Sequence, residues 1–307
     1  HDSAATGTPM EFSIFLPAAE GPRPLVWFLS GLTCTWANVT EKGEFRAACA
    51  THDFWYHSFY FDNGFSQRGD YDLGIGIEEY GFPADMSGLD VLDVGTGSGW
   101  FATLFEQRGA RVTTVDVRGY GDFDVFGRPG YLPIEHSRPV PDLVLPGGRP
   151  VYHSPVSKGF WVMKDLLGLE AGFTNARIYD LRPELFDGST FDLVFVGSLL
   201  MHVRDPIAAL AAARSVCRGR LIANTLRIEG DGDSDTTPFQ ILLATPESSI
   251  NWWLPSRACV RKWFEGAGFR ECSIAGTVTL VPDSPYADEL GRSSACRQVL
   301  HLVNARP

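Results

Sequence analysis

Short apolar runs alternate with amphipathic stretches along most of this 307-residue chain. Short continuous apolar runs are typical of buried strands, and apolar residues three or four positions apart are typical of helices. The pattern predicts seven strands, at 90–95, 111–117, 176–181, 191–200, 219–226, 269–276 and 297–305. It predicts helices at 100–109, 158–169, 206–216 and 256–268. This alternation predicts an α/β fold with a mostly parallel sheet and helices on both faces.

Two segments depart from the alternation. Residues 118–157 are rich in Gly, Pro and Asp, which predicts a long insertion or lid. Residues 1–50 contain two strand candidates, at 11–17 and 24–31, and a helix candidate at 43–50. We therefore expect an N-terminal extension over 1–50 and one main domain over 51–307.

The charge balance changes which partners we expect. The chain has 26 basic and 37 acidic residues and a net charge of −11. Proteins that bind polyanions usually carry a basic surface, so neither nucleic acid nor an anionic membrane is expected as a partner. No apolar run reaches the roughly 18 residues of a membrane span, and no signal peptide is recognisable at the start of the sequence. These features favour a cytoplasmic protein whose partner is a small molecule.

Cysteines and acidic residues offer weak metal signals. Six cysteines lie far apart with no CxxC pair, which favours free thiols over a zinc site. An acidic loop holds carboxylates at alternating positions, namely Glu229, Asp231, Asp233 and Asp235. Such a loop can bind Mg²⁺ or Ca²⁺ but is more often simply solvated. We expect no metal in this protein.

The strongest chemical signal is a glycine turn that follows the apolar run 90–95. Its residues read DVGTGSG and include Asp93, Gly95, Thr96, Gly97 and Gly99. Glycine lets a ligand approach the backbone, and the helix that follows offers free N–H groups. Asp116 ends the next predicted strand, where a carboxylate can accept both hydroxyls of a ribose. A dinucleotide fingerprint would need glycine at position 100, which is Trp100, although a turn with no ligand also remains possible.

The DxGxGxG pattern resembles motif I of class I S-adenosylmethionine-dependent methyltransferases. Further segments, in this order, resemble the branch that contains the bacterial tRNA wobble-uridine carboxymethyltransferases: WYH at 55–57, FWVMKDLLG at 160–168, FDLVFVGSLLMHVRDP at 191–206, NTLRIEGD at 224–231, and NWWLPS with VRKWFEGAGF within 251–269. The resemblance covers about 54–307. It implies a Rossmann-like fold and S-adenosylmethionine as cofactor. The residues expected to hold the cofactor are Asp93, Gly95, Thr96, Gly97, Gly99, Asp116, Val117, Asp180, Leu181 and Ser198. Asp180 could meet the adenine amine or cap a helix.

Departures from that branch bear on which group is transferred. The relative that uses carboxy-S-adenosylmethionine has a tyrosine where this chain has Met201. Its lysine-bearing WKW segment is replaced by GIGIEEYGF. Arg297 loosely matches its carboxylate-binding arginine. We therefore expect plain S-adenosylmethionine and transfer of a methyl group.

Candidates for catalysis and acceptor binding follow from their places in the pattern. His202 comes after the fourth predicted strand, and His57 stands beside Trp55 and Tyr56. Either histidine could be the base that deprotonates a hydroxyl acceptor, or a structural residue. Trp55, Met201, Trp252, Trp253 and Arg297 are candidates for the acceptor site. For the two adjacent tryptophans, packing in the core is the alternative.

Residues 1–50 resemble the start of S-formylglutathione hydrolase, an α/β-hydrolase esterase, through PMEFSIFLP and PLVWFLSGLTCTW. A hydrolase of that fold needs a nucleophile elbow of the form GxSxG, and the chain has none. We expect no esterase chemistry. The sequence as a whole predicts methyl transfer to a small or sugar-like hydroxyl acceptor. The alternatives are a tRNA-modifying (carboxy)methyltransferase and a cofactor-binding module without catalysis.

Overall fold

The computed structural model describes residues 45–46, 48–50, 55–117, 119, 122–126, 143–144, 150–151, 157–228, 233–245, 250–283 and 298–307. Its strands are β1 (Phe59–Tyr60), β2 (Ser66–Gln67), β3 (Tyr71–Asp72), β4 (Asp90–Val94), β5 (Arg111–Asp116), β6 (Leu143–Val144), β7 (Pro150–Val151), β8 (Gly172–Asn175), β9 (Phe191–Val196), β10 (Cys217–Leu226), β11 (Gln240–Leu242), β12 (Trp253–Pro255), β13 (Glu271–Pro282) and β14 (Gln298–Arg306). Its α-helices are α2 (Trp100–Gln107), α3 (Lys158–Leu167), α4 (Pro206–Ser215) and α5 (Arg257–Gly266). Its 3₁₀ helices are η1 (Ile77–Tyr80), η4 (Ile178–Asp180), η5 (Pro183–Phe186) and η6 (Leu200–His202).

Eight strands form the main sheet, in the order β3-β13-β14-β10-β9-β4-β5-β8. The strands from β10 to β8 pair in parallel, and β14 runs antiparallel between β10 and β13. The predicted α/β class with a mostly parallel sheet is confirmed. The sheet has eight strands rather than seven because the short β3 pairs antiparallel with the end of β13.

The third strand lies earlier in the chain than the sequence predicts. Residues 176–181 look β-prone, yet the strand beside β5 is β8, Gly172–Asn175. The segment that follows turns into η4, and the backbone N–H of Ala176 donates to the carbonyl of Asp116. Asp180 therefore does not end a strand, and that part of the prediction is wrong.

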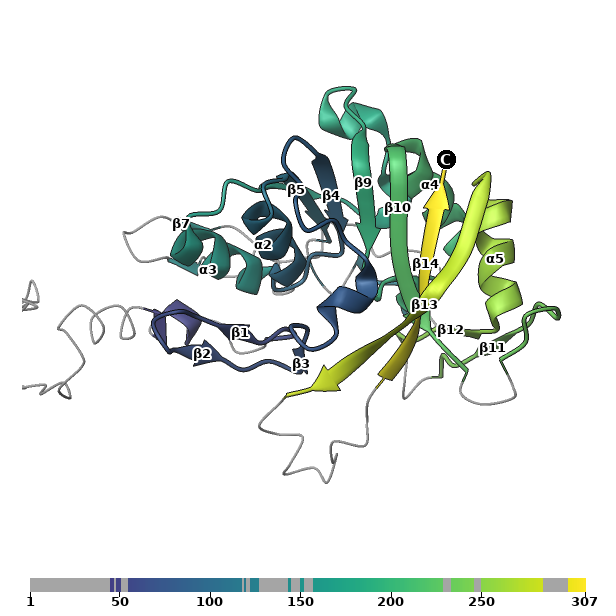
Figure 1. Ribbon diagram of the computed structural model, residues 1–307, viewed down its shortest axis with the longest axis horizontal. Coiled ribbons are helices and arrows are strands. Elements are labelled where there is room, and N and C mark those ends of the chain that lie inside the picture. The colour runs from purple at the N-terminus through teal and green to yellow at the C-terminus, as the bar shows by residue number, and fades with distance from the viewer. Residues whose placement is uncertain are drawn as a thin grey trace, which may run out of the picture.

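Both faces of the sheet are buried, which explains the continuous apolar runs. Side chains on one face join the core beside α2 and α3, for example Val91, Leu193, Phe195 and Ile222 with Phe101 and Phe160. Alternate side chains join the core beside α4 and α5, for example Leu92, Val194 and Leu221 with Leu210 and Phe264. Figure 1 shows these two helix pairs on opposite sides of the sheet.

Helix α5 illustrates how the sequence produces these elements. Ser256 precedes the helix, and its hydroxyl accepts a hydrogen bond from the backbone N–H of Cys259. A cap of this kind is worth about 1 kcal/mol. Val260, Trp263 and Phe264 recur at helical spacing and are buried against the sheet. The helix predicted at 256–268 is confirmed.

The segment 55–72 brings residues from before the glycine turn to the end of the sheet. The hairpin β1–β2 precedes β3, and His57 forms an isolated bridge with Tyr71. Residues 45–50 contribute Ala48 and Cys49 to a small core with Trp55, Phe59 and α3. The predicted strands at 11–17 and 24–31 lie outside the described residues, as does most of the insertion 118–157. None of the helices in the described part is long and apolar enough to cross a membrane.

Candidate functional site

A cavity of about 530 Å³ opens at the carboxyl ends of the parallel strands. Its walls include the ends of β4, β5, β9 and β10 and the loops that follow them. Tyr56, His57 and Tyr71 close one side, and Leu280 near the end of β13 joins them. Ligands of open α/β sheets bind at this edge of the sheet.

The glycine turn joins β4 to α2, and its glycines have different roles. Gly95, Gly97 and Gly99 adopt φ values of +81°, +52° and +83°, which favour glycine. Gly95 and Gly97 line the cavity. Gly99 does not, and a Cβ there would lie 2.8 Å from the Phe160 ring. Gly99 therefore lets α3 pack against the start of α2, while Gly95 and Gly97 face the ligand space.

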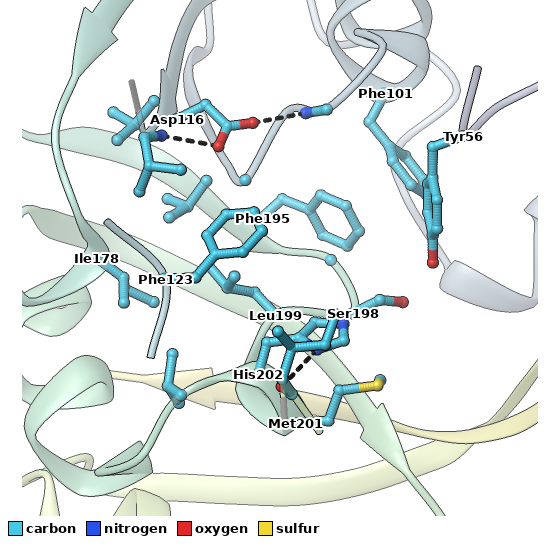
Figure 2. A pocket seen from close by; sticks show the side chains of 18 of the residues that line it. Tyr56, Phe101, Asp116, Phe123, Ile178, Phe195, Ser198, Leu199, Met201 and His202 are labelled. Atoms are coloured by element: carbon cyan, nitrogen blue, oxygen red, sulfur yellow. Dashed lines mark hydrogen bonds between the residues drawn. The ribbon is translucent and has the colours of Figure 1, made fainter. Parts of the chain in front are cut away.

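Asp116, at the end of β5, is held by the turn itself. Its two carboxylate oxygens accept hydrogen bonds from the backbone N–H groups of Gly97 and Val117, both at 2.8 Å, as Figure 2 shows. Burial raises the pKa of this carboxyl to about 6. A carboxylate has about four acceptor positions, so two remain for donors from a ligand. Asp116 and Val117, both expected from the sequence to hold the cofactor, line the cavity.

Asp93 and Thr96 lie behind the turn and do not line the cavity. Both are buried, and burial raises the pKa of the Asp93 carboxyl to about 7. The cofactor-binding role that the resemblance implies for them stays a prediction. Their place beneath the turn suits a supporting role instead.

Residues that follow β8 line the cavity on the side of Asp116, although they are not the ones predicted. Arg177, Ile178 and Tyr179 line it, whereas Asp180 and Leu181 do not. Asp180 pairs with the guanidinium of Arg177 at 2.8 Å, and this pairing lowers the pKa of the Asp180 carboxyl. The cavity is thus lined by neighbours of the two predicted residues, because β8 ends at Asn175.

The loop after β9 brings Ser198, Met201 and His202 to the cavity. Nδ1 of His202 lies 3.1 Å from the carbonyl oxygen of Ile250. A carbonyl only accepts hydrogen bonds, so Nδ1 carries the proton and Nε2 keeps its lone pair. Burial lowers the pKa of His202, which favours this neutral form. In Figure 2, Asp116 lies in the upper part of the view and His202 in the lower part, with Phe195 between them.

His57 also lines the cavity but differs from His202. It is buried, and its Nδ1 has no hydrogen-bond partner among the described residues. Burial lowers the pKa of His57 to about 3, so the ring is neutral at physiological pH. A buried polar atom without a partner at the wall of a cavity suits contact with a bound ligand.

Most of the predicted acceptor residues do not reach the cavity. Trp55 packs in the small core beside α3, and Trp252 and Trp253 donate their indole N–H groups to the carbonyls of Asp124 and Arg204. The tryptophans thus follow the packing alternative, whereas Met201 does line the cavity. Arg297 lies outside the described residues.

Asp233 and Asp235 of the acidic loop are occupied by arginines, and Glu229 and Asp231 lie outside the described residues. No group of three or more potential metal ligands occurs in the described part of the chain.

The wall also contains residues that the sequence alone did not single out. They are mainly aromatic and aliphatic, and include Tyr71, Tyr80, Phe101, Phe123, Tyr179 and Phe195. They come from six separate elements and loops, so no local spacing connects them. Tyr80 belongs to the EEYGF stretch that stands in place of the lysine-bearing segment.

The arrangement fits S-adenosylmethionine. The ionised Asp116 carboxylate is an acceptor and a ribose diol supplies two donors, so the two groups are complementary. Apolar side chains beside it, such as Ile178 and Phe123, suit the faces of an adenine ring. His57 offers an unpaired ring nitrogen beside Gly97. Trp100 starts α2 where a pyrophosphate-binding turn would need glycine, which argues against a dinucleotide.

Comparisons with known proteins agree with this geometry. A family model described as a methyltransferase domain matches residues 70–273. The tRNA U34 carboxymethyltransferase of Dichelobacter nodosus is 30% identical over 202 residues, covering 64% of this chain and 51% of that protein. The enzyme of the same name from Idiomarina loihiensis is 30% identical over 193 residues, covering 62% and 48%. This chain thus spans about half the length of these relatives.

Two further matches bear on the fold and on the N-terminal resemblance. The N-terminal domain of EvdMO1, crystallised in the presence of SAH and D-fucose, superposes with a TM-score of 0.52 at 17% identity, covering 85% of this chain and 94% of that one. The S-formylglutathione hydrolase of Paracoccus denitrificans is 40% identical over 85 residues, covering 26% of this chain and 30% of that protein. The first supports the fold, and the second confirms that part of this chain resembles an esterase.

Proposed function

Because this chain belongs to the methyltransferase domain family, we propose that it transfers a methyl group from S-adenosylmethionine to a hydroxyl oxygen of a small, sugar-like acceptor. The observation that carries the proposal is the position of Asp116. Its buried carboxylate is fixed by the glycine turn at one end of a cavity whose other end contains His202. One group can therefore hold a ribose while the other meets an acceptor.

The chain's own residues supply positioning and a proton acceptor. The sulfonium of S-adenosylmethionine supplies an already activated methyl group, so alignment of the two reactants provides much of the rate. Asp116 and the backbone of Gly95 and Gly97 fix one end of the cofactor. His202 presents Nε2 as an acceptor because its Nδ1–H is committed to Ile250. It can take the hydroxyl proton as the acceptor oxygen attacks.

Transfer of a methyl rather than a carboxymethyl group is supported by the wall at Met201. This side chain is buried and lines the cavity at the position where the carboxy-S-adenosylmethionine enzyme has tyrosine. A thioether accepts hydrogen bonds only weakly and cannot donate one to a carboxylate. The additional carboxylate of carboxy-S-adenosylmethionine would find no hydrogen-bond donor at Met201. It would face an apolar side chain there, at a cost of about a few kcal/mol.

Modification of tRNA is the second candidate because the curated relatives that match 62–64% of this chain carry that activity in their names. The net charge of −11 weighs against it, since tRNA binding relies on cationic contacts with phosphates. The lining of the cavity also weighs against tRNA as the acceptor, because Arg177 is the one lysine or arginine among its described residues.

Radiolabelled methyl transfer tests the proposal and separates the two acceptor classes. The protein is incubated with methyl-labelled S-adenosylmethionine and either free sugars, beginning with D-fucose, sugar conjugates and small phenols, or total tRNA. We expect label in a small hydroxyl compound and none in tRNA. Label in tRNA would replace the small-molecule reading by the second candidate. Binding of the cofactor without transfer to any of these acceptors would favour a non-catalytic module.

A further inference from the structure

Ser198 has an unusual backbone conformation at the edge of the cavity. It follows β9 by two residues and lines the cavity. Its φ of +51° is one that residues other than glycine rarely adopt. Its backbone N–H and its hydroxyl both donate to Oδ1 of Asn224 on β10. The Asn224 side chain thus holds the loop after β9 in place.

These contacts determine which way the Asn224 amide points. The backbone N–H of Ser198 can only donate, so the atom of Asn224 that faces it must be the oxygen. The amide nitrogen therefore faces the other way, and Nδ2 donates to the hydroxyl oxygen of Tyr80 at 3.0 Å. Asn224 is buried, with 1% of its surface exposed, so water does not compete for these bonds.

The Tyr80 hydroxyl is consequently an acceptor toward Asn224, and its own proton points elsewhere. None of the described residues accepts a hydrogen bond from that hydroxyl. Tyr80 is 3% exposed and lines the cavity. A buried O–H without an acceptor is costly, which indicates that a ligand provides one.

The ring of Tyr80 is held firmly enough for such a role. It packs against Phe82, Phe101 and Phe195 with ring centroids 5.3, 5.4 and 5.9 Å away. Burial raises the pKa of the phenol, so the hydroxyl stays protonated and remains a donor across the physiological range.

The cavity needs neutral donors if it is to bind an anion. Arg177 supplies the one lysine or arginine side chain among the described lining residues, and it is paired with Asp180 beyond β8. The amino-acid part of S-adenosylmethionine carries a carboxylate. That carboxylate must therefore be bound by hydroxyl, imidazole or backbone groups.

We propose that the Tyr80 hydroxyl, oriented by Asn224, donates a hydrogen bond to the carboxylate of the bound cofactor. This inference rests on the proposed function, since it assumes that S-adenosylmethionine occupies the cavity. It assigns Tyr80 to cofactor recognition and Asn224 to positioning both Tyr80 and Ser198.

Calorimetry on the full chain tests the contact with two probes, S-adenosylhomocysteine and its decarboxylated analogue. The wild type is expected to bind S-adenosylhomocysteine at least tenfold more tightly than the analogue. Tyr80→Phe keeps the ring and removes the donor, so its discrimination should fall to about threefold or less. Tyr60→Phe is the matched control, because Tyr60 does not line the cavity and its hydroxyl donates to Asp283 at 2.8 Å; it should keep the wild-type discrimination.

A second variant guards against a folding defect in Tyr80→Phe. Asn224→Asp replaces the amide by a carboxylate, which still accepts from Ser198 but captures the Tyr80 proton instead of donating to its oxygen. Asn224→Asp should therefore lose the discrimination between the two probes, although Tyr80 itself is unchanged. If Tyr80→Phe stays folded and discriminates between the two probes as well as the wild type does, the inference is overturned while the proposed function stands. A wild type that binds neither probe would overturn the proposed function.

Discussion

The guanidinium of Arg68 and the carboxylate of Asp283 meet at 2.8 Å although 215 positions separate them in the sequence. The same carboxylate accepts hydrogen bonds from the hydroxyls of Ser58 (2.6 Å) and Tyr60 (2.8 Å). Asp283 follows β13, and its three partners lie in the segment 55–72, which also carries His57. This one carboxylate therefore ties the wall in front of the glycine turn to the main sheet.

Asp283→Ala should loosen that wall. Hydrogen bonds to a charged group are worth about 1.5–3 kcal/mol each, but these are partly exposed, so we expect a loss of about 2 kcal/mol in the free energy of unfolding. We also expect severalfold weaker binding of S-adenosylhomocysteine. Urea unfolding and calorimetry measure the two effects. Arg68→Ala is the milder comparison, since that side chain is 44% exposed; it should cost less than about 1 kcal/mol. Equal effects of both variants would contradict the central place of Asp283.

His202→Asn should abolish proton removal while keeping a donor to Ile250. We expect turnover to fall by about 10²–10⁴-fold and affinity for S-adenosylhomocysteine to change by less than threefold. Turnover of the wild type should fall at acidic pH, because a histidine base must be neutral. Since burial lowers the pKa of His202, the midpoint of that fall should lie below the ordinary histidine value of about 6.5.

His57 provides the contrast for this experiment. Its pKa of about 3 places its titration outside the range in which the protein is assayed. Unchanged turnover per folded molecule in His202→Asn would remove His202 from the mechanism and leave positioning alone.

The affinity for the cofactor should depend on pH through Asp116. Its pKa of about 6 means that the carboxyl becomes ionised between about pH 5 and 7, and only the ionised form accepts hydrogen bonds with both oxygens. Binding of S-adenosylhomocysteine should therefore strengthen as the pH rises through about 6. Asp116→Asn should bind weakly with little pH dependence, whereas Asp62→Asn, at an exposed position, should behave as the wild type. A wild-type affinity independent of pH would contradict this role.

Removal of residues 1–44 should leave cofactor binding within about tenfold of the full chain, or about 1.4 kcal/mol. We place the boundary before Phe45, because the ring centroids of Phe45 and Phe61 lie 4.7 Å apart and Ala48 and Cys49 are buried. Removal of residues 1–50 should lower stability for that reason. A shortened protein that is folded yet has lost the cofactor would show that the extension belongs to the site.

The full chain should also fail to hydrolyse S-formylglutathione, since it has no GxSxG elbow. A colorimetric thiol assay checks this. Turnover above that of a heat-denatured sample would show that residues 1–50 keep the chemistry of the esterase they resemble.

The sequence predicted most of the sheet because each central strand is apolar on both faces. β8 was misplaced because GFTN is short and half polar, while the following ARIYDL has a stronger strand composition. The glycine turn and Asp116 were predictable because they are adjacent to strands that are themselves clear. Tyr80 and Asn224 were not, because 144 positions separate them and their contact arises only from packing.

Calorimetric titration with S-adenosylhomocysteine and with NAD tests the central claim most directly. We predict that the wild type binds S-adenosylhomocysteine and does not bind NAD, since Trp100 stands where a pyrophosphate turn needs glycine. Asp116→Ala should weaken binding by about 1.5–3 kcal/mol for each charged hydrogen bond lost. Tight binding of NAD together with no heat from S-adenosylhomocysteine would contradict the account.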